Sequence, residues 1–470
     1  MSRLKVSEII EATGGRVVSG GKGEAFFPGV SIDSRTIREG ELFIALKGER
    51  FDGHDFLAGA MGRAGGAVVS SLSAPAAGGK IVVLVKDTLK ALQDIARFVR
   101  MKGPVTVIGI TGTNGKTTTK ELIASILGTK HRIMKNTGNL NNHIGLPLSL
   151  TRMENGDEFA VLEMGASAGG DIRQLCDIAA PDYGVITNIG PGHLEGFGNL
   201  DGVRRAKLEL MDSVKTVAAN GDDGFLMEGI RQRRSSSGPE IITFGIGGGG
   251  DVRAKDVALQ ERSSAFSICL PDGGCAEVFL RLGGKFNIYN ALAAASVCYA
   301  AGAGIGEIRE GIESFRGVPM RLEVKELFGA TVISDVYNAN PASMEEGIKE
   351  LVRLRKKRAI AVLGDMLELG TYAEEAHRKL GRWMSGLPVD VFIAAGPLMS
   401  SAAFEFSAGD DTGRKQAVAV SDSSEARRKL LRICREGDTI LVKGSRGMHM
   451  EEVTEEAGLC VGPAGGGDAL

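Results

Sequence analysis

The sequence has no excess of charge of either sign and no long apolar run. Its 56 lysines and arginines are balanced by 58 aspartates and glutamates, which leaves a formal net charge of −2. This balance argues against a globally basic surface for nucleic acid or an anionic membrane, so any phosphate binding must be local. No stretch of about 18 apolar residues occurs, and we predict no transmembrane helix. The N-terminal MSRLKVSEIIEATGG carries charges inside a short amphipathic pattern, which is not typical of a signal peptide.

Cysteine is scarce and scattered. The six cysteines contain no CxxC pair, which is not the pattern of a disulfide framework. We therefore expect reduced thiols in a cytoplasmic protein. Hydrophobic residues make up 43% and charged residues 24%, a globular composition that excludes disorder over most of the length. The 67 glycines are about twice the usual share and predict tight turns and close approaches of backbone to ligand.

Apolar runs and helical patterns divide the chain into three blocks. At roughly 100–200 residues per domain, a chain of 470 residues holds two to four domains. We place the blocks at residues 1–103, 104–318 and 319–470, with Gly103-Pro104 as the first break. Apolar runs without alternation indicate strands buried on both faces, and their alternation with helices predicts parallel, doubly wound α/β sheets.

The individual elements follow from the same patterns. Strands are expected at 42–46, 67–69, 81–85, 105–110, 159–163, 183–189, 331–335, 359–365, 389–395 and 439–445. Helices are expected at 88–102, 290–304, 343–355, 372–386 and 423–435. We expect a loop with hairpins between 247 and 283, and a disordered tail at 463–470.

One glycine-rich stretch has the context of a phosphate-binding loop. GITGTNGKTTTKE (109–121) follows a buried strand and precedes an apolar helical pattern. Gly112 and Gly115 let the backbone close around phosphate oxygens at a helix N-terminus. Lys116 is placed to reach the β- and γ-phosphates, and Thr117 to ligate Mg²⁺. Five residues instead of the usual four separate the two outer glycines, so the alternative of a glycine turn with a solvated lysine stays open.

Four segments together resemble the Mur ligase family of ATP-dependent, amide-forming enzymes. They read TGTNGKTTT (111–119), NTGNLNNHIGLPLSL (136–150), DVYNANPASM (335–344) and LGDMLELG (363–370). The likeness extends along the chain, from VSIDSRTIREGELFIALKGERFDGHDF (30–56) to VKGSRGMHMEEV (442–453). One departure is visible, because Phe286 stands where the family usually has a histidine in G-x-H-N-x-x-N-A.

The resemblance implies an α/β fold of three domains and a reaction. The domains are a small α/β N-terminal domain for the UDP-substrate, a central P-loop ATPase-like parallel-sheet domain for ATP, and a C-terminal Rossmann-like domain. The implied enzyme joins D-alanyl-D-alanine to the C-terminal carboxylate of UDP-N-acetylmuramoyl-tripeptide through an acyl phosphate, in cytoplasmic peptidoglycan precursor synthesis. Both partners are small molecules, no nucleic acid or membrane is involved, and we expect a monomer. The nucleotide would lie between the second and third domains.

The resemblance also implies a metal site. Glu163 ends a buried strand, where open α/β sheets place ligand residues, and His193 lies in a glycine-rich loop after the next strand. Carboxylate and hydroxyl oxygens suit Mg²⁺, and an imidazole suits Mn²⁺. We expect Thr117, Glu163, His193 and a carbamylated Lys207 to hold the cation, with Lys116, Glu163, His193 and Lys207 as the catalytic residues. Without the resemblance, a loop histidine is more often structural and Lys207 would be a solvated surface charge.

The remaining assignments concern nucleotide and substrate. The implied nucleotide contacts are Gly112, Thr113, Asn114, Gly115, Lys116, Thr117, Thr118, Asn287, Arg321 and Asp335. From sequence alone, Asn287 and Asn290 would instead be helix N-caps, Arg321 a linker cation and Asp335 a cap. The implied substrate contacts are Ser31, Asp33, Ser34, Arg35, Asn139, Asn142, Asn338 and Asn340. Lys443, Ser445 and Arg446 are weaker candidates for a carboxylate of the peptide substrate.

Other functions remain open at this point. One is a sibling ligase that adds a different amino acid, or a folylpolyglutamate-type synthetase; YNANP (337–341) argues against the sibling that adds the third amino acid. Another, from a different class, is a P-loop ATPase or regulatory nucleotide-binding module that makes no amide.

Overall fold

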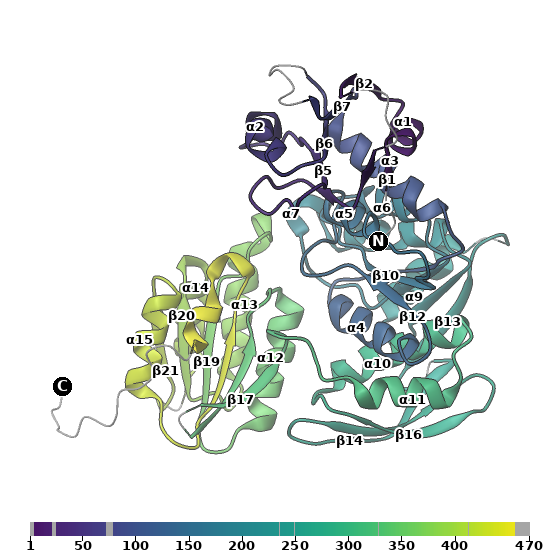
Figure 1. The fold of residues 1–470 in the computed structure, drawn as a ribbon. Helices are drawn as coiled ribbons and strands as arrows, with labels where there is room; N and C mark the ends of the chain where they lie inside the picture. Colours follow the sequence, from purple (N-terminus) through teal and green to yellow (C-terminus); the bar gives the residue numbers. More distant parts are fainter. Residues whose placement is uncertain are drawn as a thin grey trace.

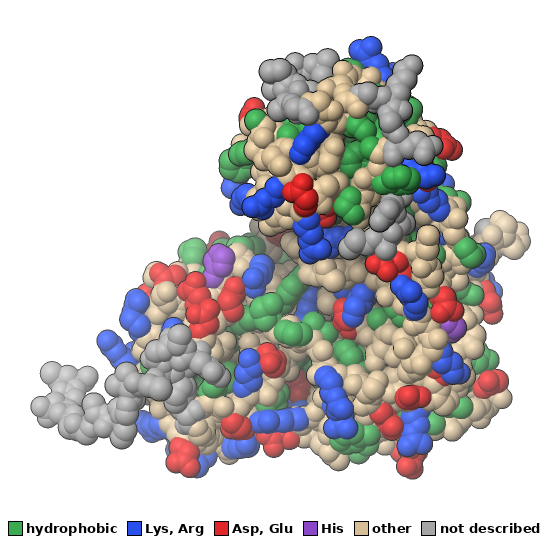
Figure 2. Space-filling view, viewed as in Figure 1, with side chains coloured by type: hydrophobic (Ala, Val, Ile, Leu, Met, Phe, Trp, Pro, Cys, Tyr) green, Lys and Arg blue, Asp and Glu red, His purple; other side chains and the backbone are tan. Residues whose placement is uncertain are grey.

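Three α/β units make up the chain, as the sequence predicts. The computed structural model describes residues 4–20, 25–71, 79–234, 236–248, 250–327, 329–411 and 413–455. The expected disordered tail at 463–470 and Cys460 lie outside the described residues. Figure 1 shows the N-terminal unit on top of the central one, with the C-terminal unit beside them. Acidic and basic side chains are interspersed over all three units on the face shown in Figure 2.

The N-terminal unit is a small mixed sheet with helices around it. Its elements are β1 (Leu4–Lys5), α1 (Val6–Thr13), β2 (Arg16–Ser19), β3 (Phe26–Phe27), β4 (Val30–Ser31), β5 (Leu42–Ile44), η1 (Gly53–Phe56), α2 (Leu57–Met61), β6 (Gly66–Val69), β7 (Ile81–Leu84) and α3 (Thr88–Met101). The strand order is β2-β7-β6-β5-β4, in which β2 alone is antiparallel to its neighbour. Helix α3 connects this unit to the central one, because the Arg100 guanidinium donates to the Ala179 carbonyl at 3.0 Å and pairs with Asp182 at 3.2 Å.

The central unit contains the longest sheet. Its elements are β8 (Thr106–Thr111), α4 (Lys116–Leu127), β9 (Ile133–Lys135), α5 (Gly145–Leu150), β10 (Phe159–Glu163), α6 (Asp171–Ala179), β11 (Tyr183–Ile186), α7 (Leu194–Phe197), α8 (Leu200–Lys207), η3 (Leu208–Asp212), β12 (Thr216–Asn220), α9 (Gly224–Arg233), β13 (Glu240–Gly245), β14 (Val252–Leu259), β15 (Ser264–Cys269), β16 (Cys275–Leu280), α10 (Lys285–Ala300) and α11 (Ile305–Ser314). The strand order is β16-β15-β14-β13-β12-β11-β8-β10-β9. The pairs β14–β15 and β15–β16 are antiparallel, and the other neighbouring pairs are parallel.

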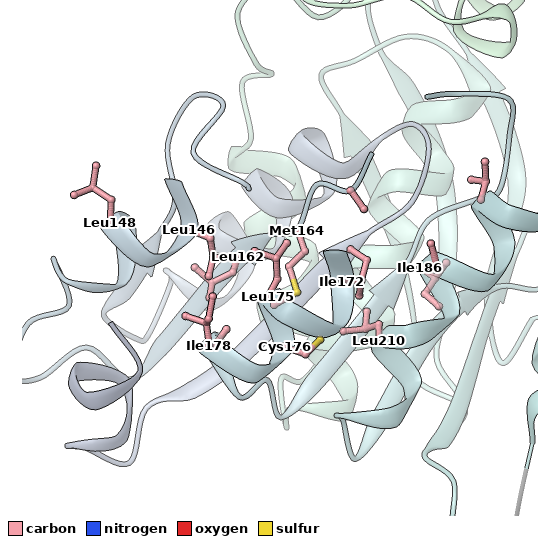
Figure 3. Close-up of a cluster of buried hydrophobic side chains, with 14 of the residues drawn as sticks. Leu146, Leu148, Leu162, Met164, Ile172, Leu175, Cys176, Ile178, Ile186 and Leu210 are labelled. Atoms are coloured by element: carbon pink, nitrogen blue, oxygen red, sulfur yellow. The ribbon is translucent and has the colours of Figure 1, made fainter. Parts of the chain in front are cut away.

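The central parallel strands β8, β10 and β11 are buried on both faces of this sheet, as the absence of apolar–polar alternation predicts. In β10, Leu162 belongs to one hydrophobic cluster and Val161 to the cluster on the other face. Figure 3 shows the first cluster, in which Leu146 of α5 and Leu175 of α6 lie near Leu162. Removing such side chains from water stabilises the sheet by about 1.5–3 kcal/mol each. The sheet is therefore a rigid base for the loops at its edge.

Strands β10 and β11 pair with β8 on either side, in parallel register. Glu163 lies opposite Ile110, and Ile186 opposite Thr111. All three strands therefore end at the same edge of the sheet. The loop that follows β8 must lie between the last residue of β10 and the first residues after β11, where open α/β sheets bind ligands.

The C-terminal unit is a second parallel sheet. Its elements are β17 (Glu323–Leu327), β18 (Ala330–Asp335), α12 (Pro341–Leu354), β19 (Ala359–Gly364), η4 (Gly370–Tyr372), α13 (Ala373–Ser385), β20 (Val391–Ala395), α14 (Pro397–Ala408), β21 (Gln416–Val420), α15 (Ser423–Ile433), β22 (Thr439–Lys443), η5 (Arg446–Met448) and η6 (Met450–Thr454). The order is β17-β18-β22-β19-β20-β21, and only β17 is antiparallel to its neighbour. None of the helices in the described ranges is long and apolar enough to cross a membrane.

One prediction about the cysteines is wrong. The structure links Cys269 and Cys275 in a disulfide, although we expected reduced thiols throughout. The two residues face each other in the β15–β16 pair, a pairing that the six-residue spacing did not reveal. Among the other described cysteines, Cys176 and Cys298 are free and buried, and Cys434 is free and half-buried.

Candidate active site

The loops at the edge of the central sheet enclose a cavity shared with the C-terminal unit. Its volume is about 840 Å³, within the usual range for small-molecule sites. The central unit contributes the loops after β8, β10 and β11 and the start of α10, and the C-terminal unit contributes the loops after β18, β19 and β22. The segment 320–322 between the two units also lines it. Of the described residues of the N-terminal unit, none lines this cavity.

The phosphate-loop prediction is supported by the backbone at both glycines. Gly112 has φ 142° and Gly115 has φ 81°. A Cβ on Gly112 would lie 2.0 Å from Thr187 Oγ1, and one on Gly115 would lie 2.2 Å from Asn290 Oδ1. Only glycine fits either position. No side chain in the described structure caps the N-terminus of α4, so its first N–H groups are left for an anion, as in phosphate-binding loops.

The loop is bonded to the residues that follow β11. The Asn114 amide N–H donates to Asn188 Oδ1 at 3.0 Å, and the Asn114 carbonyl accepts from Thr187 Oγ1 at 2.6 Å and from Asn188 Nδ2 at 3.0 Å. Sequence reasoning missed Thr187 and Asn188, although a polar Thr-Asn directly after a buried strand is the signal that identifies them. These bonds fix the main chain of the loop to the sheet edge.

Lys116 lies over its own loop. Its ammonium donates to the Gly112 carbonyl at 2.9 Å and to the Thr113 carbonyl at 3.0 Å. Burial lowers the pKa of this ammonium, the nearby Glu163 carboxylate acts against that shift, and the Arg321 guanidinium adds to it. The charge is therefore concentrated where the glycine backbone turns.

Thr117 and Glu163 come together, as expected, and Arg321 joins them. The Thr117 hydroxyl donates to Glu163 Oε2 at 2.7 Å and accepts from the Arg321 guanidinium at 2.9 Å. Asn141 Nδ2 donates to the other oxygen of the Glu163 carboxylate, Oε1, at 2.9 Å. The Arg321 guanidinium lies 3.9 Å from the centre of the Tyr337 ring, and its buried Nε has no partner in the described structure. A carboxylate beside a hydroxyl is a donor set that suits Mg²⁺, which keeps several waters and needs few protein ligands.

The other two expected metal ligands do not join this pair. His193 Nδ1 pairs with Glu368 Oε2 of the C-terminal unit at 2.7 Å, which holds the pKa of that carboxyl below its usual value. Lys207 is buried with 3% of its surface exposed, so the alternative of a solvated surface charge is wrong. Its Nζ lies 5.4 Å from the centre of the Phe197 ring. No group of three or more His, Cys, Asp or Glu side chains in the described part of the chain is arranged to hold a metal.

Burial is also the main reason that Lys207 has an unusual pKa. Desolvation, followed by the charge of Lys116, lowers the pKa of Lys207 from 10.5 to about 7. The carboxylates of Asp171, Glu209 and Glu163 act in the opposite direction but do not cancel the shift. A large part of this amine is therefore neutral at neutral pH.

Two asparagines of α10 border the phosphate loop. Gly284 occupies the cap position of this helix, so the alternative that Asn287 and Asn290 are N-caps is wrong. Asn287 lies inside the first turn and donates through Nδ2 to the Gly283 carbonyl at 2.7 Å. Asn290 packs against Gly115 and donates to Asn287 Oδ1 at 3.3 Å. Both asparagines and Phe286 line the cavity.

The candidate residues of the C-terminal unit lie in or beside the cavity wall, and several of them form hydrogen bonds or ion pairs with one another. The buried Lys443 ammonium pairs with the Asp335 carboxylate and donates to the Asn338 carbonyl at 3.0 Å. Asp335 is not a helix cap, because Asn340 occupies the cap position of α12. The Asn340 side chain caps α12 by accepting from the Ser343 N–H at 2.9 Å. Ser445 Oγ accepts from the Leu367 N–H at 2.9 Å, which gives it a structural role.

The remaining candidates divide between the cavity and the N-terminal unit. Thr113, Thr118, Asn139 and Asn142 line the cavity, as do Arg446 and Asn338. Ser31, Asp33, Ser34 and Arg35 lie outside it, in and after β4. There, Arg35 forms an exposed ion pair with Asp33 at 2.7 Å, which lowers the pKa of that carboxyl to about 2.

Three family models match the chain in succession. The Mur ligase family, catalytic domain, matches residues 27–100, the Mur ligase middle domain matches 110–298, and the Mur ligase, glutamate ligase domain, matches 320–446. The UDP-N-acetylmuramoyl-tripeptide–D-alanyl-D-alanine ligase of Bacillus subtilis is 37% identical over 97% of this chain and 98% of its own length. The protein of the same name from Escherichia coli is 34% identical over 92% of this chain and 94% of its own length.

Solved structures share the arrangement of all three units. MurF from Acinetobacter baumannii superposes with a TM-score of 0.88 at 32% identity, covering 97% of this chain and 98% of that one. The MurF ligase of Thermotoga maritima in complex with ADP has a TM-score of 0.78 at 31% identity, covering 91% of this chain and 96% of that one. The likeness confirms the predicted α/β fold with three domains.

The depressed pKa of Lys207 makes a prediction about stability. Between about pH 7 and 10.5 the unfolded chain binds a proton on this amine that the folded chain lacks, so this amine makes stability rise with pH across that window. From pH 7 to pH 9 the gain is about 2 kcal/mol. We expect Lys207→Met to have a higher free energy of unfolding than the wild type at pH 7. We also expect it to lack the increase in stability that the wild type shows between pH 7 and pH 9.

Urea unfolding followed by circular dichroism at pH 7 and pH 9, in bicarbonate-free buffer, measures the effect. Lys255→Met, at an exposed position of β14, is the matched control and should keep the wild-type pH dependence. An identical pH dependence in Lys207→Met and the wild type would contradict the burial of a titrating amine.

Proposed function

The chain belongs to the Mur ligase family, and from this premise we propose that it joins D-alanyl-D-alanine to the C-terminal carboxylate of UDP-N-acetylmuramoyl-tripeptide, with ATP converted to ADP and phosphate. The observation that carries the proposal is the glycine loop with Lys116, Thr117 and Glu163 at one sheet edge, in a chain that is similar over nearly its whole length to ligases of this name. We place the reaction in the cytoplasm, and we propose a monomer.

The proposed reaction activates a carboxylate, which is a poor electrophile. In the first step a carboxylate oxygen attacks the γ-phosphorus of ATP, and ADP leaves. In the second step the amine of D-alanyl-D-alanine attacks the carbonyl carbon of the acyl phosphate. The tetrahedral intermediate then expels phosphate and loses a proton, which leaves the amide. Phosphoryl transfer of this kind depends mainly on positioning and charge stabilisation by the protein.

Two anions must meet in the first step. At about 4 Å, two like unit charges repel by about 4 kcal/mol at an effective dielectric constant of about 20. The Lys116 ammonium and the uncapped N-terminus of α4 lie where they offset this repulsion, and the Arg321 guanidinium reaches the same place from the segment between domains. Mg²⁺, when bound at Thr117 and Glu163, supplies further neutralisation of phosphate charge.

Lys207 and His193 complete the proposed catalytic set. A neutral lysine amine adds to CO₂ and releases one proton, which leaves an anionic carbamate where the protonated lysine would carry a positive charge. The pKa of about 7 supports this reaction, since much of the amine is unprotonated at neutral pH. We propose that the carbamate serves as a cation ligand, and that His193 contributes to the same site after exchanging its bond to Glu368.

We propose that each domain binds a different part of the substrates. We assign residues 1–103 to the UDP-substrate, with Ser31, Asp33, Ser34 and Arg35 as its contacts. Residues 104–318 bind ATP, and residues 319–470 close the cavity and contribute Asp335 and Asn338. Asn139 and Asn142, in the cavity wall beside Glu163, would contact the sugar or the phosphates. Enclosure of the acyl phosphate by two domains limits its hydrolysis by water.

The test is ADP release in the presence of Mg²⁺, measured with each substrate omitted in turn. The proposal expects ADP release and a new peptide bond, detected by mass spectrometry, only when UDP-N-acetylmuramoyl-tripeptide and D-alanyl-D-alanine are both present. Single amino acids, UDP-precursors with shorter peptides and folate substrates test the sibling ligases and the folylpolyglutamate-type synthetase. ATP hydrolysis that needs no substrate, with no product, would instead favour an ATPase or regulatory module.

Replacement of the loop lysine gives the second prediction. Lys116→Ala removes the ammonium that offsets charge on the phosphates, and we expect kcat to fall by roughly 10²–10⁴-fold. Coupled detection of ADP under saturating substrates measures it. Lys120→Met is unsuitable as a control because Lys120 is buried, so the exposed Lys255→Met serves again. Wild-type turnover in Lys116→Ala would rule out the proposed role.

Replacement of Lys207 gives the third prediction. Lys207→Ala removes the amine that forms the carbamate, and we expect activity to fall and to return in part when formate, acetate or propionate is added. A short carboxylate can occupy the volume of the lost side chain and supply the missing oxygen ligands. Wild-type activity in Lys207→Ala without any added carboxylate would refute the carbamate, as would a loss that no carboxylate restores.

A further inference from the structure

A pair of asparagine side chains joins the phosphate loop to the C-terminal domain. Asn340 Nδ2 donates to Asn114 Oδ1 at 2.8 Å, and Asn114 Nδ2 lies 3.4 Å from Asn340 Oδ1 in the reverse direction. The two residues are 226 positions apart in the chain, and both are half-buried in the cavity wall. Asn114 lies within the loop, two residues before Lys116.

The Asn340 amide is held in place from its own side. Its Oδ1 accepts from the Ser343 N–H at 2.9 Å, and its own N–H donates to Ser343 Oγ at 3.0 Å. This reciprocal capping box fixes the side chain at the start of α12. The side-chain nitrogen of Asn340, Nδ2, points at Asn114. The position of α12 therefore sets the direction of this nitrogen.

Asn114 is held just as firmly, but only through its main chain. Its N–H and carbonyl are bonded to Thr187 and Asn188 after β11, as described above. The only described partner of its side chain is Asn340. The pair is therefore a direct contact between the C-terminal domain and the turn that positions Lys116.

We propose that Asn340 is a positioning residue, which through Asn114 sets the geometry of the phosphate loop when the C-terminal domain is docked. This inference rests on the proposed function, because it names how the ATP site of that reaction is assembled. It also revises the expectation that Asn340 contacts substrate: its Oδ1 and Nδ2 are already bonded to Ser343 and Asn114.

Other contacts hold the domain when this pair is broken. His193 and Glu368 form an ion pair across the same interface, and the Arg353 guanidinium donates to the Gln260 carbonyl at 2.8 Å. Loss of the asparagine pair should therefore change the loop without undocking the domain.

The test compares two replacements that both keep the helix cap. Serine and aspartate are as good as asparagine at this position, so Asn340→Ser and Asn340→Asp should both leave α12 intact and the melting temperature unchanged. Asn340→Ser is too short to reach Asn114. Asn340→Asp still reaches it and accepts from Asn114 Nδ2 after that amide rotates.

We expect Asn340→Ser to weaken binding of a non-hydrolysable ATP analogue, measured by calorimetry, by about tenfold, the range of one net hydrogen bond. The kcat should fall by a similar factor, with the KM for UDP-N-acetylmuramoyl-tripeptide unchanged. Asn340→Asp should restore most of both values. A change confined to the KM for the UDP-substrate, or equal behaviour of the two variants, would overturn the proposal in favour of substrate contact or of capping alone.

A double-mutant cycle with Asn114→Ala tests that the effect passes through this pair. In the Asn114→Ala background, Asn340→Ser should change analogue affinity by less than about twofold, because the interaction is already absent. A full tenfold effect in that background would refute the coupling. Calorimetry needs no turnover, so the cycle decides the positioning role even if the chain is not a ligase. A wild-type chain that binds the analogue but forms no peptide bond would refute the proposed function and not this inference.

Discussion

The parallel register of three strands is the constraint on which the site depends. Strands β10 and β11 pair with β8 so that Glu163 and Thr187 reach the same edge as the glycine loop. The Thr117 hydroxyl meets the Glu163 carboxylate because α4 starts directly after that loop. A slip of one residue in the β8–β10 pairing would turn the Glu163 side chain to the other face of the sheet. Burial of β8 and β10 on both faces prevents such a slip, because it would also displace apolar side chains from both clusters.

Buried lysines are the second feature of the site, and folding alone does not explain them. Lys116 and Lys207 both have lowered pKa values, and in both cases burial is the largest cause. Taking ammonium groups out of water costs free energy that their partial pairing does not recover. Groups with such pKa shifts are concentrated at functional sites, where they bind an anion or take part in the reaction. The Lys116 charge also disfavours protonation of Lys207, so a bound polyphosphate would weaken this repulsion by neutralising Lys116.

Much of the fold could be predicted from the sequence, and less of the site. Apolar runs without alternation located β10 and most strands of the C-terminal domain to within a few residues, because burial on both faces leaves a strong signal. The phosphate loop was equally clear, since glycine, lysine and threonine follow in order. The partners of the polar side chains could not be predicted. Pairing of His193 with Glu368 depends on how two domains dock, and the burial of Lys207 depends on the packing of α8, neither of which has a local sequence signal. The Cys269–Cys275 pair was missed for a related reason, because the register of a hairpin brought the two thiols together.

Contacts between domains use some of the same atoms that the proposed chemistry requires. Thr117 Oγ1 accepts from Arg321, and His193 Nδ1 faces Glu368, while both Thr117 and His193 are assigned to a cation. A guanidinium and a divalent cation repel each other, so a cation bound at Thr117 would require Arg321 to turn away from that hydroxyl. Its Nε lies buried without a partner in the described structure, and a phosphate oxygen would satisfy both that atom and the released N–H. If Arg321 exchanged the Thr117 oxygen for a phosphate oxygen, ATP binding would be coupled to the position of the C-terminal domain without a large rearrangement.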